Sequence, residues 1–218
     1  MTDAVVHIAG RPNPLSIRIN GPHPTFFLGT DKLEAQLLTQ ITPRYYDFLE
    51  IASVIFAADG TVRRGGNARA DMGSAWRRGF NFEIPVRDPE FWSDPEVTDL
   101  LVETASFLTD DDYAFDFSPN EGSASSQPYL DLNPQGALFP ADDVVLFSGG
   151  LDSYSGALDL LANSDDKVIL VTHRSAQKVI PRQVELGEYL SRRFPDRVKH
   201  LHLVARRKGA ESKDTTQR

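Results

Sequence analysis

The chain lacks cysteine altogether. No disulfide framework and no tetrahedral thiolate zinc site can therefore be built from it. It also lacks any stretch that approaches the about 20 consecutive apolar residues of a membrane-spanning helix, so no membrane partner is expected. Residues 1–11 have neither the basic nor the apolar region of a secretory signal peptide, and the cytoplasm is the expected location.

Two common nucleotide-binding motifs are missing as well. A Walker A loop follows the pattern G-x-x-x-x-G-K-[ST], and no glycine in this chain is followed by lysine. The G-x-G-x-x-G fingerprint of dinucleotide-binding Rossmann domains is also absent. A nucleotide site in this protein must therefore use another kind of loop.

Positive charge is scarce in the first part of the chain. The formal net charge is −8, and the excess of Asp and Glu lies before residue 140, whereas the remainder is slightly basic. An acidic surface repels phosphates, so the first part is a poor surface for nucleic acid. With 218 residues and 40% apolar content, the chain is expected to form one large or two small domains.

The most informative feature present is the serine–glycine turn, residues 148–153, which reads S-G-G-L-D-S. Residues 144–147, just before it, form a short apolar run typical of a central parallel strand covered by helices on both faces. After it, apolar side chains at positions 154, 157, 158 and 161 have the spacing of one helix face. The turn is therefore predicted to join a strand to a helix that starts at about Asp152.

This placement favours phosphate binding. The first N–H groups of a helix lack intrahelical partners and carry the positive end of the helix dipole. Gly149 and Gly150 let the backbone approach an anion, and both can adopt positive φ, so that successive N–H groups form a concave nest. We predict that phosphate is bound by the backbone of these glycines and of Leu151, and by the hydroxyls of Ser148 and Ser153.

The next segment has the pattern of a nucleotide-binding βαβ unit. A second apolar strand is predicted at residues 168–171, parallel and adjacent to the first. Thr172 and His173 follow at its carboxyl end, where ligands of open α/β sheets bind, and are predicted to contact the nucleotide. A helix that Pro181 opens and a strand at residues 198–204 are expected to complete the unit.

The S-G-G-x-D-S pattern resembles the loop of the PP-loop, or N-type, ATP pyrophosphatase superfamily, and the match is full over the motif. In that family the loop holds the β,γ-pyrophosphate of ATP while a substrate oxygen attacks the α-phosphorus. The resemblance implies ATP and Mg²⁺ as cofactors. It also implies a catalytic role for Asp152, which would orient Mg²⁺ or the loop, and for Lys178, or alternatively Arg182, which would reach phosphate or substrate.

Within the superfamily, the chain is similar to 7-cyano-7-deazaguanine synthases of queuosine biosynthesis, and more so to their relatives in bacterial antiphage defence systems. The similarity rests on residues 145–153, on Val171-Thr172 followed by Gln177, and on T-T-Q-R at residues 215–218. The long N-terminal region favours the defence-associated branch. The resemblance implies adenylation of a carboxylate or amide on a deazaguanine-like small molecule or a modified macromolecule, with protein partners in a defence complex. Unlike the biosynthetic enzyme, the chain has no zinc-binding cysteines.

Two other functions stay open at this point. One is a different PP-loop enzyme, such as a tRNA-modifying or amide-forming ligase. The other is a non-catalytic nucleotide-binding subunit of a defence complex, which docks through its acidic N-terminal part.

For each of these functions the expected fold class is α/β. An α+β domain, residues 1–118, precedes a linker, residues 119–140, and a Rossmann-like parallel-sheet PP-loop domain, residues 141–218. Three strands are few for such a domain, so more of it is expected to follow, and activity is expected only of the full-length protein.

The N-terminal domain offers no convincing catalytic set. Its patterns predict strands at residues 5–8, 15–19, 80–86 and 112–117, and helices at residues 43–58 and 95–108. Arg63 and Arg64, with Trp76, Arg77 and Arg78, form either an anion or partner surface or an exposed loop with a packed Trp. His200 and His202 share one strand face, but no third ligand lies near them, so no metal site is predicted.

Overall fold

The computed structural model describes residues 2–37, 41–64, 76–120, 139–174 and 177–208. These form an α/β fold with six helices, and the chain divides into two compact units. Unit 1 comprises Met1–Phe27, Thr42–Ala124 and Arg206–Arg218; unit 2 comprises Leu28–Ile41 and Ser125–Ala205. The Ala124–Ser125 boundary falls inside the predicted linker. The division differs from the predicted domains in two segments, since residues 28–41 belong to unit 2 and residues from 206 onward to unit 1.

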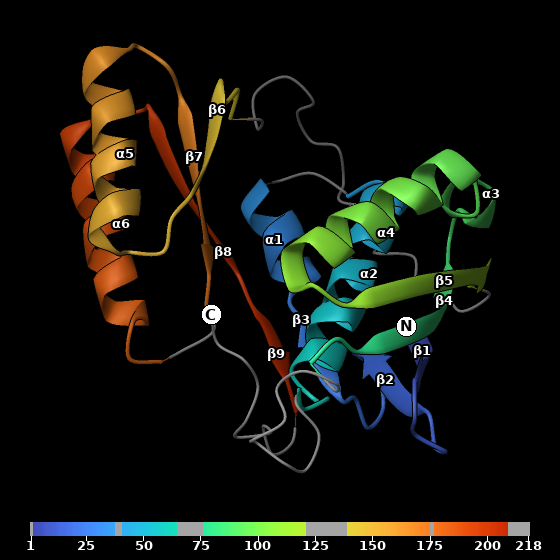
Figure 1. Ribbon diagram of the computed structural model, residues 1–218. Coiled ribbons are helices and arrows are strands. Elements are labelled where there is room, and N and C mark those ends of the chain that lie inside the picture. The colour runs from blue at the N-terminus through green and yellow to red at the C-terminus, as the bar shows by residue number, and fades with distance from the viewer. Residues whose placement is uncertain (1, 38–40, 65–75, 121–138, 175–176, 209–218) are drawn as a thin grey trace. The chain divides into compact units, whose positions relative to one another are not determined.

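Unit 1 is built on a six-stranded sheet in the order β5-β4-β1-β2-β3-β9 (Figure 1). Its strands are β1 (Thr2–Ile8), β2 (Leu15–Ile19), β3 (Phe26–Leu28), β4 (Gly79–Val86), β5 (Asp112–Pro119) and β9 (Ala205–Arg207). β1 is antiparallel to both β2 and β4, whereas β4 and β5 are parallel. The alternation of apolar residues predicted four of these strands. β3 and β9, with three residues each, are too short to show a period.

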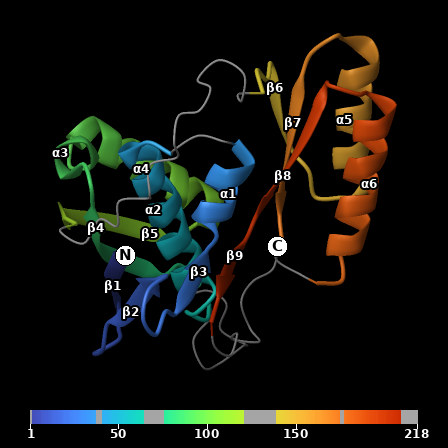
Figure 2. The same ribbon diagram turned by 180° about the vertical axis from the view of Figure 1, so that it is seen from behind.

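One face of this sheet is covered by α2 (Pro43–Asp59), α3 (Pro89–Trp92) and α4 (Pro95–Thr109) (Figure 2). Each helix has proline in its first turn, where the missing N–H is not needed, and Asp94 caps α4 by accepting a bond from the Glu96 amide. Alternate residues of β1 and β4, such as Val6 and Phe82, are fully buried beneath them. The two longer helices confirm the predictions for residues 43–58 and 95–108.

Buried ion pairs account for two of the four arginines near Trp76, Arg64 and Arg78. Asp111 is fully buried and accepts hydrogen bonds of 2.6 Å from the guanidinium groups of both Arg64 and Arg78. Arg78 also bonds to Asp59 and to the carbonyl of Val62. The Arg64 guanidinium lies 5.5 Å from the centre of the Trp76 ring. Burial by itself lowers the pKa of Arg78, but its bonds to Asp111 and Asp59 outweigh that effect, so the pKa stays above its ordinary value. Arg64 and Arg78 therefore form part of the core of unit 1 and do not form an anion surface.

Unit 2 is a three-stranded parallel sheet in the order β6-β7-β8, compatible with a Rossmann-like fold. Its strands are β6 (Asp143–Leu146), β7 (Val168–His173) and β8 (Val198–Leu203). α5 (Leu151–Asn163) and α6 (Ile180–Arg193) cover one face, and α1 (Thr30–Leu37) packs against β8 on the other (Figure 1). The predicted order of strands and helices after residue 141 is confirmed, whereas α1 was not predicted.

The outer edge of β8 is closed by a side chain. The amide of Gln36, on α1, donates to the carbonyl of His202 at 3.2 Å and accepts from the His202 N–H at 2.9 Å. A single glutamine thus replaces the two hydrogen bonds that another strand would make there.

At the other edge, β6 differs from the prediction of a strand covered on both faces. Val145 and Phe147 pack into the core with α5 and α6, but Val144 and Leu146 are 66% and 80% exposed. These two side chains point to the face opposite α5 and α6, and within the described ranges the helix on that face, α1, packs against β8 and not against β6. An apolar run of four residues could not distinguish an edge strand from a central one.

In the same described ranges, no helix is long and apolar enough to cross a membrane.

Candidate functional site

The serine–glycine turn joins β6 to α5, as predicted. Gly149 has φ = +76°, a conformation that side-chain-bearing residues rarely adopt. Gly150 is the N-cap of α5 with φ = −80° and ψ = 169°, which is extended backbone open to any residue. Only one of the two glycines therefore takes the positive φ that was considered for both.

The two serine hydroxyls close the turn on itself. Ser148 Oγ accepts a bond of 3.2 Å from the Gly150 N–H and lies 3.0 Å from Ser153 Oγ. Ser153 Oγ in turn donates to the Gly150 carbonyl at 3.1 Å. Ser148 is exposed and Ser153 half-buried, so both hydroxyls are at the surface, where they can exchange these internal bonds for bonds to an anion.

Several backbone N–H groups of the turn have no internal acceptor. Among the residues that the structure describes, no hydrogen-bond acceptor faces the N–H of Gly149, Leu151 or Asp152. The last two open the 13-residue helix α5, whose dipole places its positive end there. Leu151 is 72% exposed, so the start of α5 lies at the surface. The arrangement suits an anion with several oxygens.

Thr172, predicted to contact the nucleotide, lies behind the turn. It is fully buried, and its hydroxyl donates to the Phe147 carbonyl at 2.8 Å. The same hydroxyl lies 2.7 Å from Nε2 of His200, and because its proton is already used, it accepts from that nitrogen. Burial, together with the nearby His202 and Arg174, lowers the pKa of His200 to about 4, so this imidazole is neutral at physiological pH. The part that Thr172 plays at the site is therefore indirect.

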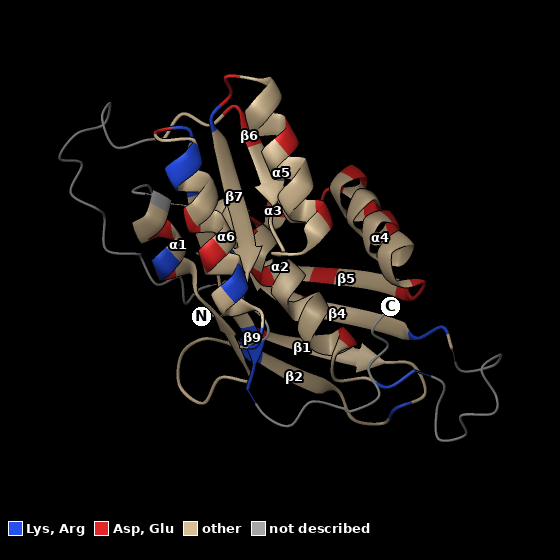
Figure 3. Ribbon diagram, turned by 90° about the vertical axis from the view of Figure 1, so that its left-hand side faces the viewer, with Lys and Arg blue, Asp and Glu red and all other residues tan. Residues whose placement is uncertain are grey.

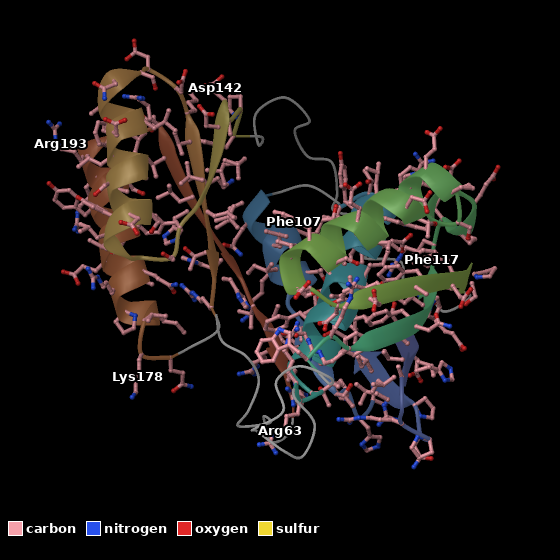
Figure 4. All side chains as sticks on the ribbon, in the orientation of Figure 1. Arg63, Phe107, Phe117, Asp142, Lys178 and Arg193 are labelled. Carbon is pink, nitrogen blue, oxygen red and sulfur yellow. The ribbon has the colours of Figure 1, made fainter. Side chains whose placement is uncertain are left out.

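His173, the other residue predicted at the end of this strand, is exposed and bonds through Nε2 to the Ala205 carbonyl at 2.9 Å. Asp152 is exposed on the first turn of α5. Lys178 is exposed just before α6, and Figure 4 shows it at the end of unit 2 where that helix begins. Within the described ranges, no hydrogen bond or ion pair joins the side chain of Asp152 or Lys178 to the other residues of the turn, so their predicted catalytic roles depend on a bound substrate.

Gln183, which the sequence did not single out, does contact the turn. It lies in the first turn of α6, is only 3% exposed, and donates from Nε2 to the Ser148 carbonyl at 3.1 Å. A single glutamine in a helix carries no signal of this kind, because only the packing of α6 against the turn brings the two together.

Arg207 and the pair His200 and His202 make contacts within the fold. Arg207 donates to the Gly60 carbonyl within unit 1, and β9, which carries it, is the basic strand of Figure 3. The rings of His200 and His202 lie 4.2 Å apart, but His200 is bonded to Thr172, and the described residues contain no cluster of three potential metal ligands. Arg182 and Gln177 are exposed at the start of α6, and residues 215–218 lie outside the described ranges.

No protein-family model, curated protein or solved structure matches this chain. The function is therefore inferred from the residues of the turn and their surroundings.

Proposed function

We propose that the serine–glycine turn binds the β,γ-pyrophosphate of ATP and that the full-length protein is an ATP-dependent adenylating enzyme. The observation that carries this proposal is the combination at one helix N-terminus of Gly149 at φ = +76°, N–H groups without internal acceptors, and the paired hydroxyls of Ser148 and Ser153. Each feature favours an anion, and the family resemblance of the motif identifies that anion as pyrophosphate.

The reaction follows from which part of ATP is held. An oxygen of the acceptor carboxylate or amide forms a bond to the α-phosphorus, while the bond from that phosphorus to the bridging oxygen breaks. The electron pair of the broken bond leaves with pyrophosphate, and the acceptor becomes an acyl or imidoyl adenylate. N–H groups that bind pyrophosphate more strongly as its charge grows stabilise this transition state.

Charged residues complete the proposed site. Asp152 supplies an exposed carboxylate beside the phosphates, which suits Mg²⁺, since this ion is commonly held by one or two carboxylates together with substrate phosphates. Lys178 or Arg182, both exposed at the start of α6, would neutralise phosphate or substrate charge. His173, at the carboxyl end of β7, would contact the nucleotide.

The acceptor proposed from the family resemblance is a deazaguanine-like acid or amide, used in an antiviral defence complex in the cytoplasm. A tRNA-modifying or amide-forming ligase with the same loop would use another acceptor. Exchange of labelled pyrophosphate into ATP that depends on a deazaguanine acid supports the first acceptor. Exchange that requires a different acid or an RNA assigns the second.

The test of ATP binding is Gly150→Val. Its φ and ψ suit valine, and a Cβ there would meet only Ser148 Oγ, at 3.3 Å, so the fold should persist while the side chain fills the mouth of the turn. We expect the Kd for Mg-ATP to rise about 100-fold or more by calorimetry. Gly156→Ala is the matched control, because this glycine lies within α5, the helix that Gly150 caps, and has open space around it. Equal affinity in a folded Gly150→Val protein would remove the basis of the proposal.

The products are AMP and pyrophosphate. Chromatography of a turnover mixture should show AMP as the main adenine nucleotide. ADP as the main product would contradict adenylation. Tight ATP binding without any AMP would instead assign the protein as a nucleotide-binding subunit.

A further inference from the structure

Two side chains hold the backbone just before the serine–glycine turn. The carbonyl of Phe147 accepts from Thr172 at 2.8 Å, and the next carbonyl, that of Ser148, accepts from Gln183 at 3.1 Å. Thr172 comes from β7 and Gln183 from α6, so two different elements fix two successive peptide groups.

The orientation of the Ser148 carbonyl determines that of the next N–H. In a trans peptide the C=O and N–H vectors are antiparallel. Since Gln183 holds the Ser148 carbonyl toward α6, the N–H of Gly149 is directed to the opposite side, away from α6. This is one of the N–H groups for which no described residue provides an acceptor.

Gln183 also fixes the turn by close packing. A Cβ built on Gly149 would lie 2.9 Å from Cγ of Gln183 and 3.3 Å from its Cα. The turn thus lies directly on the first turn of α6, and the positive φ of Gly149 is compatible with this approach because glycine has no side chain. Rotation of the Ser148–Gly149 peptide would require both the hydrogen bond and this contact to change.

Only the Nε2 group of the Gln183 amide makes a hydrogen bond. Its Oε1 is buried and has no hydrogen-bond partner in the described structure. An unpartnered buried acceptor is destabilising, so an apolar side chain of similar shape would serve packing at least as well. The stabilising half of the amide is the Nε2 that holds the Ser148 carbonyl.

From these contacts we infer that Gln183 is a positioning residue that orients the Gly149 N–H toward the bound phosphate. The inference rests on the proposed function, since it assumes that the turn binds pyrophosphate. Without Gln183, the Ser148 carbonyl is free to rotate toward the ligand, where its negative end would repel the phosphate oxygens.

The test uses Gln183→Met, which keeps an unbranched side chain of similar length but removes the donor. Calorimetry with Mg-ATP and with magnesium pyrophosphate as probes should show affinities about three- to tenfold weaker than those of the unmodified protein, as expected for one hydrogen bond. Thermal unfolding should give an equal or higher melting temperature, because the unpartnered Oε1 is gone. Gln183→Leu is the second variant, with the same expectation. Gln177→Met, at an exposed glutamine before α6, is the control and should change neither quantity.

The outcomes separate this inference from the proposed function. If the unmodified protein binds both probes and Gln183→Met binds them equally well, the positioning role is wrong and the phosphate site stands. If the unmodified protein binds neither probe, both proposals fall. If affinity and melting temperature fall together, Gln183 has a merely structural role. Weaker binding with unchanged or increased stability supports the inference.

Discussion

In unit 1 the fully buried carboxylates are surrounded by donors, whereas in unit 2 the carboxylate of the serine–glycine turn is exposed. Asp47 accepts from the Arg87 guanidinium, from two backbone N–H groups and from the Trp92 indole. Asp111 has a similar set, but Asp152 has no described partner. Charged residues of unit 1 thus stabilise its own fold. The proposed anion site of unit 2 is instead built from backbone N–H groups and hydroxyls, and in the described residues no charged side chain is bonded to them.

The largest expected effect comes from breaking the ion pairs of unit 1. Asp111→Ala leaves Arg64 and Arg78 buried without their shared carboxylate, and should lower the free energy of unfolding by about 3–5 kcal/mol, measured with urea. Asp112→Ala removes the neighbouring carboxylate, whose ion pair with Arg77 is 65% exposed on the aspartate side, and should change stability by less than about 1 kcal/mol. Similar losses from the two variants would contradict the structural role assigned to Asp111.

A smaller effect is expected from the two glycines within helices of unit 2. A Cβ on Gly187 would lie 2.1 Å from Nδ1 of His200, whereas one on Gly156 would meet nothing within 4 Å. Gly187→Ala should therefore destabilise the protein by about 1–3 kcal/mol despite the better helix propensity of alanine. Gly156→Ala should stabilise it by about 0.5–1 kcal/mol.

A double-mutant cycle identifies the cause of the first effect. In a His200→Ala background, Gly187→Ala should be neutral or stabilising, because the clashing ring is gone. A loss that persists in that background would place the strain elsewhere on α6.

The last effect concerns pH. The pKa of His200 is about 4 when folded, against an ordinary value of 6.5, chiefly because burial disfavours the charged ring. Between these values the unfolded chain binds more protons, so this histidine makes the free energy of unfolding increase with pH from about 4 to 6.5 and adds no slope above that range. Urea titrations at several pH values should show a shallower slope in His200→Gln. An unchanged slope in His200→Gln would contradict the burial of this ring.

Much of the fold could be predicted from the sequence because its long elements have clear periods and punctuation. Pro43 and Pro95 mark the starts of the two main helices of unit 1, and the apolar run after Lys167 marks β7. The elements that could not be predicted depend on contacts between residues far apart in the sequence. One of them is α1, which has only eight residues and a weak apolar pattern, and which packs against β8.

The same division holds for the candidate site. The turn could be predicted because all its chemistry lies within six consecutive residues, 148–153. The supports behind it could not, since Thr172, Gln183 and His200 act on the turn across 24 to 52 positions of chain and have no local motif. Thr172 was identified for its place at the end of β7, but its inward orientation depends on the Phe147 carbonyl and the His200 ring.

Gln36, at the outer edge of β8, makes the two edges of the small sheet of unit 2 differ in how readily they can pair with an additional strand. Because the Gln36 amide occupies both backbone groups of His202, an additional strand from another chain would have to displace it before pairing there. The opposite edge, along β6, carries no such block within the described residues. At β6, the strand that leads into the serine–glycine turn, an added strand would not have to displace this glutamine.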